Sequence, residues 1–481
     1  QSQTGSSAQP IIRMLPLFAS SECFALRAEH NGKFLQAVHH KGDGGSRVEA
    51  SADTVAGNAR ARFFVEPSEE HEGWVHIRYC YNNKYWVFVL DGDDNHCWYV
   101  SAAHGPNEDM RSDSCTLFKP ILEDGQDNRI RLQVSGNRSG KYASMLPMSD
   151  ITRPCLHQSD QEESFSTIGL WRQNELPKYV AFKGDNDKYL RYKDTWLRFD
   201  IEDIRDEGVI CTVYTNDDGT VQIKSNKGGY WMQRSDYDSW VDAHLSSHNN
   251  NDPDMTFKVF TGDEGFIALQ NMGNHKFCNR LEFRDWVSYL SASEKSISQG
   301  ARFKLEEPVV RREIYDVEFN LDGARIYNNA LIVLDEDQRT NNTSSVQTGS
   351  FSFTARTGVV TSWETTVSSK TASKKNISAK IGKVPIVIGA EVTLSSEAAS
   401  SQIEAGSEDN SEQTTDTQNF IVHPGQTITG KYVAMQASCD VPYSYKERIV
   451  LTTGETIVTV HEDGIYTGVN KSDFNITLTQ S

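Results

Sequence analysis

The 481-residue sequence predicts an all-β protein with several domains. Three observations lead to this fold class. Apolar and polar residues alternate with a period of two in many short runs, as they do in half-buried strands. One short phrase recurs six times in the first 308 residues. The residues that follow differ in composition and contain longer alternating runs. At about 100–200 residues per domain, this length accommodates two to four domains, each with its own core.

The recurring phrase is a short apolar-x-apolar strand, a polar turn rich in Asn, Gly and Asp, and an aromatic residue that opens a second strand. A repeated spacing indicates a repeat architecture, and each copy has the pattern of a β-hairpin. Six copies fit either one six-bladed ring or two bodies of three. The aromatic residues, spaced by 51, 57, 47, 41 and 47 positions, are Phe34, Tyr85, Tyr142, Tyr189, Tyr230 and Phe277.

Two bodies of three copies are the better interpretation. The connector 171–177 separates the third copy from the fourth and ends in a proline, as suits a domain boundary. A propeller blade needs four strands per repeat, whereas each copy here has one strong hairpin and looser strands beside it. Three hairpin pairs around a pseudo-threefold axis make a β-trefoil, which leaves no exposed sheet edge. We therefore expect two tandem β-trefoil domains, at residues 11–170 and 175–308.

Several stretches of these two domains resemble the amaranthin agglutinin family. The resemblance covers about 300 residues in matching order. It implies two β-trefoil lectin domains without catalysis. It also implies a galactose/GalNAc-type glycan on glycoproteins or glycolipids as the ligand, at a site shared between domains of a dimer. The stretches that carry the resemblance are 61–68, 73–78, 83–85, 115–120, 183–190 and 223–226.

Two matched patches are candidates for sugar binding. Sugars are held by aromatic rings stacked on their C–H faces and by short polar side chains that satisfy several hydroxyls. Such residues follow Trp86 in the first domain and Trp231 in the second, although we expect these two tryptophans themselves to be core residues. By resemblance, the leading candidates are Asn95, Trp98 and Tyr99. The second patch offers Asp236, Tyr237 and Trp240.

The composition changes after Pro308. Only one of the nine tryptophans lies beyond it, and 27 of the 80 residues in 341–420 are Ser or Thr. A flexible or glycosylated stalk would be rich in proline and would lack strands. Here Val, Ile and Phe are threaded through the segment and proline is nearly absent, so we expect long, polar, alternating strands instead.

One hairpin at about 363–405 is predicted to have an apolar face, a polar face and an apolar turn. Turns are normally polar, so five apolar residues there favour contact with lipid over an ordinary half-buried hairpin, which is the alternative. The face pattern is typical of a transmembrane β-barrel. The expected membrane-insertion turn is Val384, Pro385, Ile386, Val387 and Ile388. Residues expected to face lipid are Ile377, Ile381, Val392 and Leu394, and those expected to line the pore lumen are Lys374, Lys380, Glu391 and Glu397.

The segment 309–481 resembles the aerolysin-like pore-forming module. The stretch 383–391, its Ser/Thr-rich arms and the later strands near 424–435 and 441–445 carry this resemblance. It implies an elongated β-sheet module that forms a β-barrel pore as a ring of subunits. A lectin followed by such a module is a known combination in plant proteins. The acidic stretch 404–416 departs from the pattern.

The sequence thus predicts a glycan-binding lectin that oligomerises on target membranes and forms a β-barrel pore, as a cytolytic defence toxin would. It would be a dimer in solution and a ring when pore-forming. One alternative is a non-lytic agglutinin whose C-terminal β module serves only for oligomer assembly. Another is a carbohydrate-active enzyme with trefoil binding modules, which would need a catalytic constellation that the sequence does not contain.

Composition and sequence motifs argue against several other classes of function. The net charge of −18 argues against nucleic acid as a partner, because affinity for phosphates comes from Lys and Arg. The sequence contains no phosphate-binding glycine loop, zinc-protease motif or nucleophile-elbow motif. We therefore expect no enzymatic activity, cofactor or metal. The polar first residues lack a secretory core. The expectation is a soluble protein, cytoplasmic or released without a visible signal peptide, which becomes membrane-inserted when active.

Overall fold

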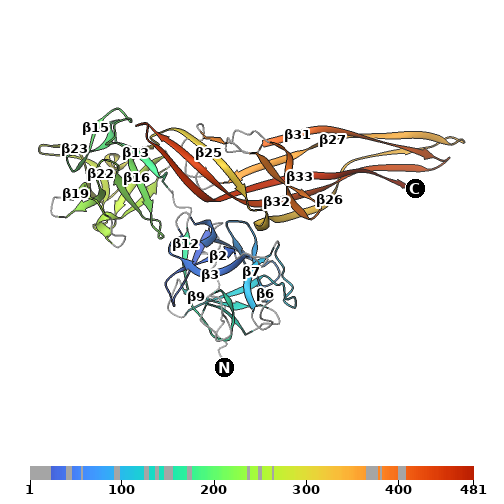
Figure 1. Ribbon diagram of the computed structural model, residues 1–481, viewed down its shortest axis with the longest axis horizontal. Coiled ribbons are helices and arrows are strands. Elements are labelled where there is room, and N and C mark those ends of the chain that lie inside the picture. Colours follow the sequence, from blue (N-terminus) through green and yellow to red (C-terminus); the bar gives the residue numbers. More distant parts are fainter. Residues whose placement is uncertain are drawn as a thin grey trace, which may run out of the picture.

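The regular structure of the chain is almost entirely β-strand, so the all-β prediction is confirmed. Figure 1 shows two compact bodies and one long arm. Among the described residues, the helical elements are short 3-10 turns of three residues each. The computed structural model describes residues 23–39, 46–55, 58–90, 98–103, 105–123, 129–135, 140–145, 155–170, 176–235, 239–247, 252–262, 265–364, 377–379, 382–398 and 408–481.

The first compact body is a sheet of twelve strands. These are β1 (Cys23–Ala28), β2 (Phe34–His39), β3 (Ser46–Ala52), β4 (Phe63–Pro67), β5 (Val75–Tyr79), β6 (Tyr85–Leu90), β7 (Trp98–Ala103), β8 (Leu117–Leu122), β9 (Arg129–Val134), β10 (Tyr142–Ser144), β11 (His157–Ser159) and β12 (Phe165–Leu170). Six strands pair in a closed ring, in the order β1, β4, β5, β8, β9, β12 and back to β1. The other six form the hairpins β2–β3, β6–β7 and β10–β11. A six-stranded ring with three hairpins is the strand arrangement of a β-trefoil.

The second compact body repeats this arrangement with twelve further strands. These are β13 (Tyr179–Lys183), β14 (Tyr189–Lys193), β15 (Trp196–Ile201), β16 (Cys211–Thr215), β17 (Val221–Ser225), β18 (Tyr230–Arg234), β19 (Trp240–Leu245), β20 (Phe257–Thr261), β21 (Phe266–Asn271), β22 (Phe277–Phe283), β23 (Trp286–Glu294) and β24 (Phe303–Glu306). The ring runs β13, β16, β17, β20, β21, β24 and back to β13. The hairpins β14–β15, β18–β19 and β22–β23 also contact one another through β15, β19 and β23.

The repeated phrase has a structural reason in the turn that joins each ring strand to its hairpin. The aromatic residue of every copy is the first residue of a hairpin strand, in β2, β6, β10, β14, β18 and β22. In four copies an Asn side chain two positions before a lysine closes the turn by accepting a backbone N–H, as an Asx turn does. The N–H groups belong to Lys33, Lys84, Lys188 and Lys276.

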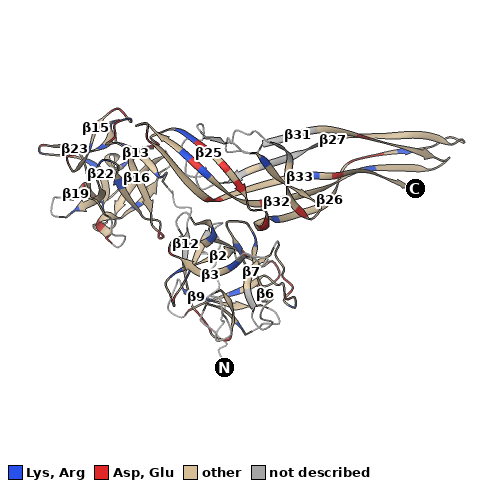
Figure 2. Ribbon diagram, viewed as in Figure 1, with Lys and Arg blue, Asp and Glu red and all other residues tan. Residues whose placement is uncertain are grey.

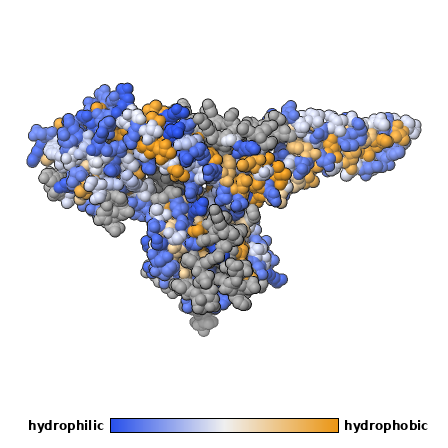
Figure 3. All heavy atoms as spheres, in the orientation of Figure 1, coloured by the Kyte–Doolittle hydropathy of each residue, from blue (hydrophilic) through white to orange (hydrophobic). Residues whose placement is uncertain are grey.

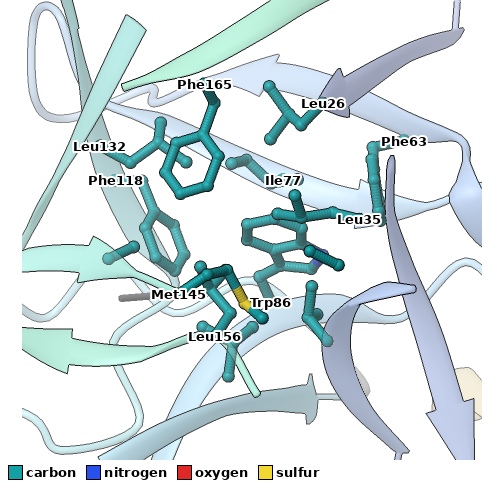
Figure 4. Close-up of a cluster of buried hydrophobic side chains, with 14 of the residues drawn as sticks. Leu26, Leu35, Phe63, Ile77, Trp86, Phe118, Leu132, Met145, Leu156 and Phe165 are labelled. Carbon is teal, nitrogen blue, oxygen red and sulfur yellow. The ribbon is translucent and has the colours of Figure 1, made fainter. Parts of the chain in front are cut away.

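Each trefoil has its own aromatic core. In the first, the fully buried Trp86 packs edge-on against Phe63 and Phe118, at ring-centroid distances of 5.0 and 5.8 Å (Figure 4). In the second, Trp231 is equally buried, and its indole N–H donates to the Ser225 hydroxyl at 3.1 Å. The interpretation of Trp86 and Trp231 as core residues is confirmed.

The long arm is a seven-stranded sheet in the order β28-β25-β32-β33-β27-β31, with β26 also paired to β32. Its strands are β25 (Val309–Phe319), β26 (Arg325–Thr340), β27 (Gln347–Glu364), β28 (Ile377–Ala379), β31 (Glu408–Val422), β32 (Thr427–Leu451) and β33 (Thr456–Gln480). The two 25-residue strands β32 and β33 are paired along nearly their whole length, which is roughly 80 Å at about 3.3 Å per residue. The elongated module expected from the sequence is therefore present.

A buried ion network crosses the base of the arm. The Arg312 guanidinium lies 2.7 Å from the Glu447 carboxylate and 3.1 Å from that of Glu307. The imidazole of His461 lies 3.0 Å from the second oxygen of Glu447. Figure 2 shows the alternating basic and acidic bands along β25 that supply part of this network. Each charge here has a partner, as buried charges require.

Both trefoils pack against the arm. The Asn83 side-chain amide of the first trefoil donates to the Asp440 carboxylate at 2.9 Å, and the ammonium of Lys84 donates to the Asp322 carbonyl at 3.3 Å. Burial lowers the pKa of Lys84, and the charge of Asp322 opposes this shift. The second trefoil contributes Tyr179 and Ile210 to an apolar cluster with two residues at the end of β32, Ile449 and Leu451.

The ion network gives a test of the arm's stability. We expect Arg312→Met to destabilise the arm by about 3–5 kcal/mol, because two buried carboxylates lose their counter-charge. The matched control is Arg339→Met, whose partner Asp337 is exposed and whose pair should contribute less than about 1 kcal/mol. Thermal unfolding followed by circular dichroism measures both. Equal melting temperatures for the two variants would contradict this account of the network.

Candidate functional site

The first predicted sugar patch falls mostly outside the described residues. Asn95 belongs to the segment 91–97, which is not described. Trp98 and Tyr99 open strand β7 and pair with Leu90 and Val89, but the description does not extend to their side chains. In the second patch, Asp236 and Tyr237 are also outside the described residues. The assignment of these five residues to sugar binding stays a prediction.

The second patch requires one correction, at Trp240. Its side chain is only 4% exposed, and its ring stacks on Trp286 with a centroid distance of 5.4 Å and an interplanar angle of 23°. Stacking on a sugar needs an open ring face, so the prediction that Trp240 presents one is wrong. The reason is that hairpin strand β23, which is distant in sequence, brings Trp286 onto the ring.

Trp240 belongs to a group of four aromatic side chains that we call the tryptophan cluster: Trp196, Trp240, Trp286 and Tyr289. Trp196 meets Trp286 edge-on at 4.9 Å, and Trp286 meets Tyr289 at 4.8 Å. Unlike Trp240, the other three members are half-buried and so keep part of their surface in solvent. The sequence analysis missed these three residues. The signal that could have found Trp196 and Trp286 is a tryptophan at the start of the second strand of each hairpin in this domain, and Tyr289 has no such signal.

Charged groups border the tryptophan cluster. The Arg198 guanidinium lies over the Tyr289 ring, 5.3 Å from its centroid, and its Nε–H donates to the Val287 carbonyl at 3.0 Å. Asp200 accepts two hydrogen bonds from Arg191, at 2.6 and 3.1 Å, and lies 3.7 Å from Arg198. An aromatic centre with donors and acceptors at its edge has the chemistry of a sugar-binding surface.

A cavity lies between the first trefoil and the arm. Its volume is about 470 Å³, which is within the range of ligand sites. Polar side chains dominate its lining, and Arg60 from the trefoil lies 3.7 Å from Glu462 of the arm. The polar lining residues are Gln36, Asn58, Arg60, His461, Glu462 and Asp463. The sequence analysis did not identify this cavity, because its two walls are about 400 residues apart in the chain.

Glu70, His71 and Glu108 are close enough to one another to hold a metal ion. However, the Glu108 carboxylate already accepts hydrogen bonds from the Ser68 hydroxyl, from His76 and from the N–H groups of Glu69 and Glu70. Burial raises the pKa of Glu108, but these hydrogen bonds outweigh burial and lower it to about 2. We infer that the Glu108 carboxylate has a structural role and links two loops by these hydrogen bonds.

The apolar run of the arm is a strand and not a turn, which corrects the sequence prediction. Residues Lys383–Ile388 form β29, and Glu391–Ala398 form β30. Ile388 pairs with Glu391, so the turn consists of Gly389 and Ala390. Gly389 has a φ of 62°, which a glycine adopts without strain at the first central position of a two-residue hairpin turn.

The apolar side chains of this hairpin are partly covered by the arm. Val387 is 1% exposed, and Val384 is also buried. Val392 from β30 packs against the same cluster. Ile388 differs, because 58% of its side chain is exposed. The expectation of five exposed apolar residues was therefore wrong for most of the run, since the arm supplies a cover. The cluster also contains Ile314, Ala324, Ala437, Cys439, Val441, Tyr443, Tyr445 and Tyr466.

Side chains of the arm hold the hairpin in place by hydrogen bonds to its backbone. Asn470 is buried, and its amide accepts from the Val387 N–H at 2.9 Å and donates to the Val387 carbonyl at 2.8 Å. Asn329 donates to the Gly389 carbonyl at 3.0 Å. Asn470 thus satisfies a peptide group at the edge of β29 that a neighbouring strand would otherwise pair with. We call Asn470 and Asn329 the asparagine latches.

The predicted pore hairpin at about 363–405 is described only in part, because residues 365–376, 380–381 and 399–407 lie outside the described residues. Of its first arm, residues 363–364 belong to β27, and the short β28 pairs in parallel with β25. β27 pairs with β31 from Gln347–Val422 to Thr361–Glu408. In the monomer, residues 377–379 pair with β25, and the predicted hairpin arm does not include this pairing.

The predicted lipid-facing and lumen-facing residues are only partly described. Lys374, Lys380 and Ile381 lie outside the described residues. Ile377 and Glu397 are placed in strands, without a description of their side chains. Glu391 is exposed, and Leu394 is 40% exposed. Their roles in a pore stay predictions. Over the part of the chain that the structure describes, no helix is long and apolar enough to cross a membrane.

Together, the fold and these sites define a protein with two β-trefoil domains and an elongated β module that carries a covered apolar hairpin. Residues 19–142 and 174–307 match the family model of the agglutinin domain. These segments make up more than half of the chain, so the chain belongs to the agglutinin domain family, which implies glycan binding. The agglutinin part of the predicted resemblance is confirmed. The finer assignment to the amaranthin type stays a prediction.

Solved structures give more distant similarities. The crystal structure of lamprey immune protein has 15% sequence identity and a TM-score of 0.30, over 74% of this chain and 87% of that chain. The structure of a mosquitocidal holotoxin has 10% identity and a TM-score of 0.28, over 63% of this chain and 36% of that chain. Both TM-scores are too low to establish a shared overall fold. Comparison with curated proteins gives no match.

The asparagine latches lead to a prediction about the hairpin. Asn470→Leu keeps the side chain's size but leaves the Val387 N–H and carbonyl without partners, at about 1–3 kcal/mol for each buried group. We expect hydrogen exchange of peptides covering 384–394 to accelerate at least tenfold, measured by mass spectrometry. The control is Asn475→Leu, an exposed residue on the same strand. Unchanged exchange in Asn470→Leu would show that the latch does not hold the hairpin.

Proposed function

We propose that this protein is a lectin that binds glycans on target membranes, assembles there into a ring, and forms a β-barrel pore with the hairpin 383–398. The observation that carries the proposal is the covered hairpin itself, whose residues Val384 and Val387 are buried in the monomer without being part of the arm's sheet. Membership of the agglutinin domain family supports the glycan-binding half.

The way in which the hairpin is attached supports its release. β29 and β30 form a separate two-stranded sheet, so among the described residues no backbone ladder joins them to the arm. Polar links between the hairpin and the arm include the side-chain hydrogen bonds of the asparagine latches. A hairpin attached in this way can detach as a unit and keep its own backbone hydrogen bonds. Its detachment costs less free energy than separating β32 from β33.

Membrane physics then requires several subunits. One chain supplies one hairpin, and an open strand edge is not tolerated in lipid. A closed barrel needs a hairpin from each of several neighbours. β29 and β30 have 6 and 8 residues, while a spanning strand needs about 9–11. The pore strands would therefore extend into the segments that connect this hairpin to β27 and β31. The Ser- and Thr-rich composition of these segments suits a barrel wall in contact with water.

The remaining properties follow from this function. The ligand would be a galactose/GalNAc-type glycan on a glycoprotein or glycolipid, and no step requires enzymatic activity. The chain would be soluble before it meets its target, and membrane-inserted afterwards. Figure 3 shows apolar residues along the arm and at its root, which neighbouring subunits would cover in a ring.

One observation favours the second candidate function, a non-lytic agglutinin whose β module only assembles subunits. β26 pairs with β32 on one side, and its other edge has no partner strand among the described residues. Leu331 and Val333 on this strand are 62% and 55% exposed. Such an edge is a template for pairing with a second chain. Assembly through β26 alone would agglutinate cells without opening a pore.

The exposed end of the hairpin separates the two functions. We expect Ile388→Asp to retain glycan binding and folding, because Ile388 is exposed in the monomer, but to lose dye leakage from vesicles that carry a GalNAc-terminated glycolipid. A carboxylate in the bilayer costs about 2.5–3.5 kcal/mol per chain. Ile388 is a better position than Val387, whose burial would make a charge disrupt the soluble fold.

The matched control for this experiment is Val346→Asp, an apolar residue that is 55% exposed and lies outside the hairpin. This variant should cause the same dye leakage from vesicles as the unmodified protein. Full leakage by Ile388→Asp would remove this residue from the membrane step. Absence of leakage from the unmodified protein, together with agglutination of the vesicles, would favour the assembly function.

A further inference from the structure

Trp196, Trp240 and Tyr289 occupy equivalent positions in the three hairpins of the second trefoil, because each pairs with the fifth residue of the first hairpin strand, and Trp286 lies three residues before Tyr289. Trp196, Trp240 and Trp286 are each the first residue of the second strand of a hairpin, in β15, β19 and β23. These three strands pair with one another around the pseudo-threefold axis. The tryptophan cluster therefore has members from each repeat of the domain.

The first trefoil shows that the fold does not require these tryptophans. In the first trefoil, the residues that pair with the fifth residue of the first hairpin strand are Arg47 and Tyr99 in the first two hairpins. Both domains form the same closed ring of six strands. A packing requirement of the fold itself would therefore apply to both domains. An arginine and a tyrosine serve at the positions that Trp196 and Trp240 occupy in the other domain, so the fold itself does not require tryptophan there.

The cluster is open to solvent on one side. Trp240 is buried at its centre, whereas Trp196, Trp286 and Tyr289 are half-buried. Val287 beside them is 45% exposed. Figure 1 places β15, β19 and β23 at the end of the second trefoil that faces away from the arm. A ligand at this end would leave the hairpin of the arm unobstructed.

We propose that Trp196, Trp286 and Tyr289 form a glycan-stacking platform in the second trefoil, with Arg198 and Asp200 as its polar edge. This inference rests on the proposed lectin function and names a binding site for it. The edge carries both donors and acceptors, which a sugar's hydroxyl groups need and a purely apolar partner would leave unsatisfied.

The preferred sugar follows from ring geometry. A galacto-configured ring has its O4 hydroxyl axial, so its opposite face presents the C–H groups at C3, C4 and C5 together. That apolar patch matches an indole face. A gluco-configured ring distributes its C–H groups over both faces. The platform should therefore take galactose or N-acetylgalactosamine in preference to glucose.

The experiment measures the binding of N-acetylgalactosamine to the full chain and to its variants by isothermal titration calorimetry. We expect Trp286→Ala and Trp196→Ala each to lose one binding site per chain, or to weaken it at least tenfold. Trp286→Phe should keep most of the affinity because a ring face remains. The matched control is Tyr214→Ala, which removes an exposed aromatic ring from the same domain outside the cluster. Glucose is the control sugar.

A second measurement needs no variant and so does not depend on folding. Oxidation of the unmodified protein by N-bromosuccinimide, followed by peptide mass spectrometry, reports how accessible each indole is. N-acetylgalactosamine should slow oxidation of Trp196 and Trp286, and glucose should not. Equal oxidation with and without the sugar, in a protein that does bind it, would overturn the platform and leave the lectin function intact. If the unmodified protein binds no galacto-configured sugar, the proposed ligand class itself is wrong.

Discussion

The middle of β32 has to bury both of its faces, and two distant parts of the chain cover them. On one face, Val441 belongs to the apolar cluster that receives the hairpin residues Val384 and Val387. On the other, the buried Asp440 accepts hydrogen bonds from Thr467 at 2.8 Å and from Asn83 of the first trefoil at 2.9 Å. One strand therefore connects a glycan-binding domain to the hairpin. A sheet of this length would otherwise leave an apolar face in water, which soluble monomers avoid.

Under the proposed function, this arrangement explains how one chain would stay soluble and still carry a hairpin that enters a membrane. While the hairpin is covered, Val384 and Val387 of the hairpin and Val441 of the arm are buried in one apolar cluster. Its departure would uncover Val441 and the neighbouring tyrosines, so release is unfavourable unless lipid receives the hairpin and a neighbouring subunit covers the arm. Binding to glycans supplies both conditions, because it raises the local concentration of chains at a membrane surface. The asparagine latches add directional bonds that set the hairpin's position, while the apolar contacts supply most of the cover.

The sequence was sufficient for the fold but not for long-range contacts. The recurring phrase encodes a local turn, with Asn-x-Lys before the aromatic residue in four of its six copies, so the six copies predicted six hairpins and the all-β class. The apolar run 384–388 was wrongly read as a turn, because a local pattern does not show that β32 and β33 would cover it or that Asn470, 83 residues away, would bond to Val387. Trp240 was identified from the polar loop before it. Its burial depends on Trp286, which only the pseudo-threefold symmetry brings into contact.

The central claim is that the hairpin must leave the arm for the protein to act on a membrane. The most direct measurement is vesicle leakage by a protein with cysteines at positions 387 and 470, where the Asn470 side chain already reaches the peptide of Val387. The unmodified chain has eight cysteines, so it is treated with the same oxidant and reductant as a control. The account predicts no leakage when the engineered disulfide is formed, with glycan binding retained, and full leakage after reduction. Full leakage with the disulfide intact would contradict it, because the hairpin would then act without leaving the arm.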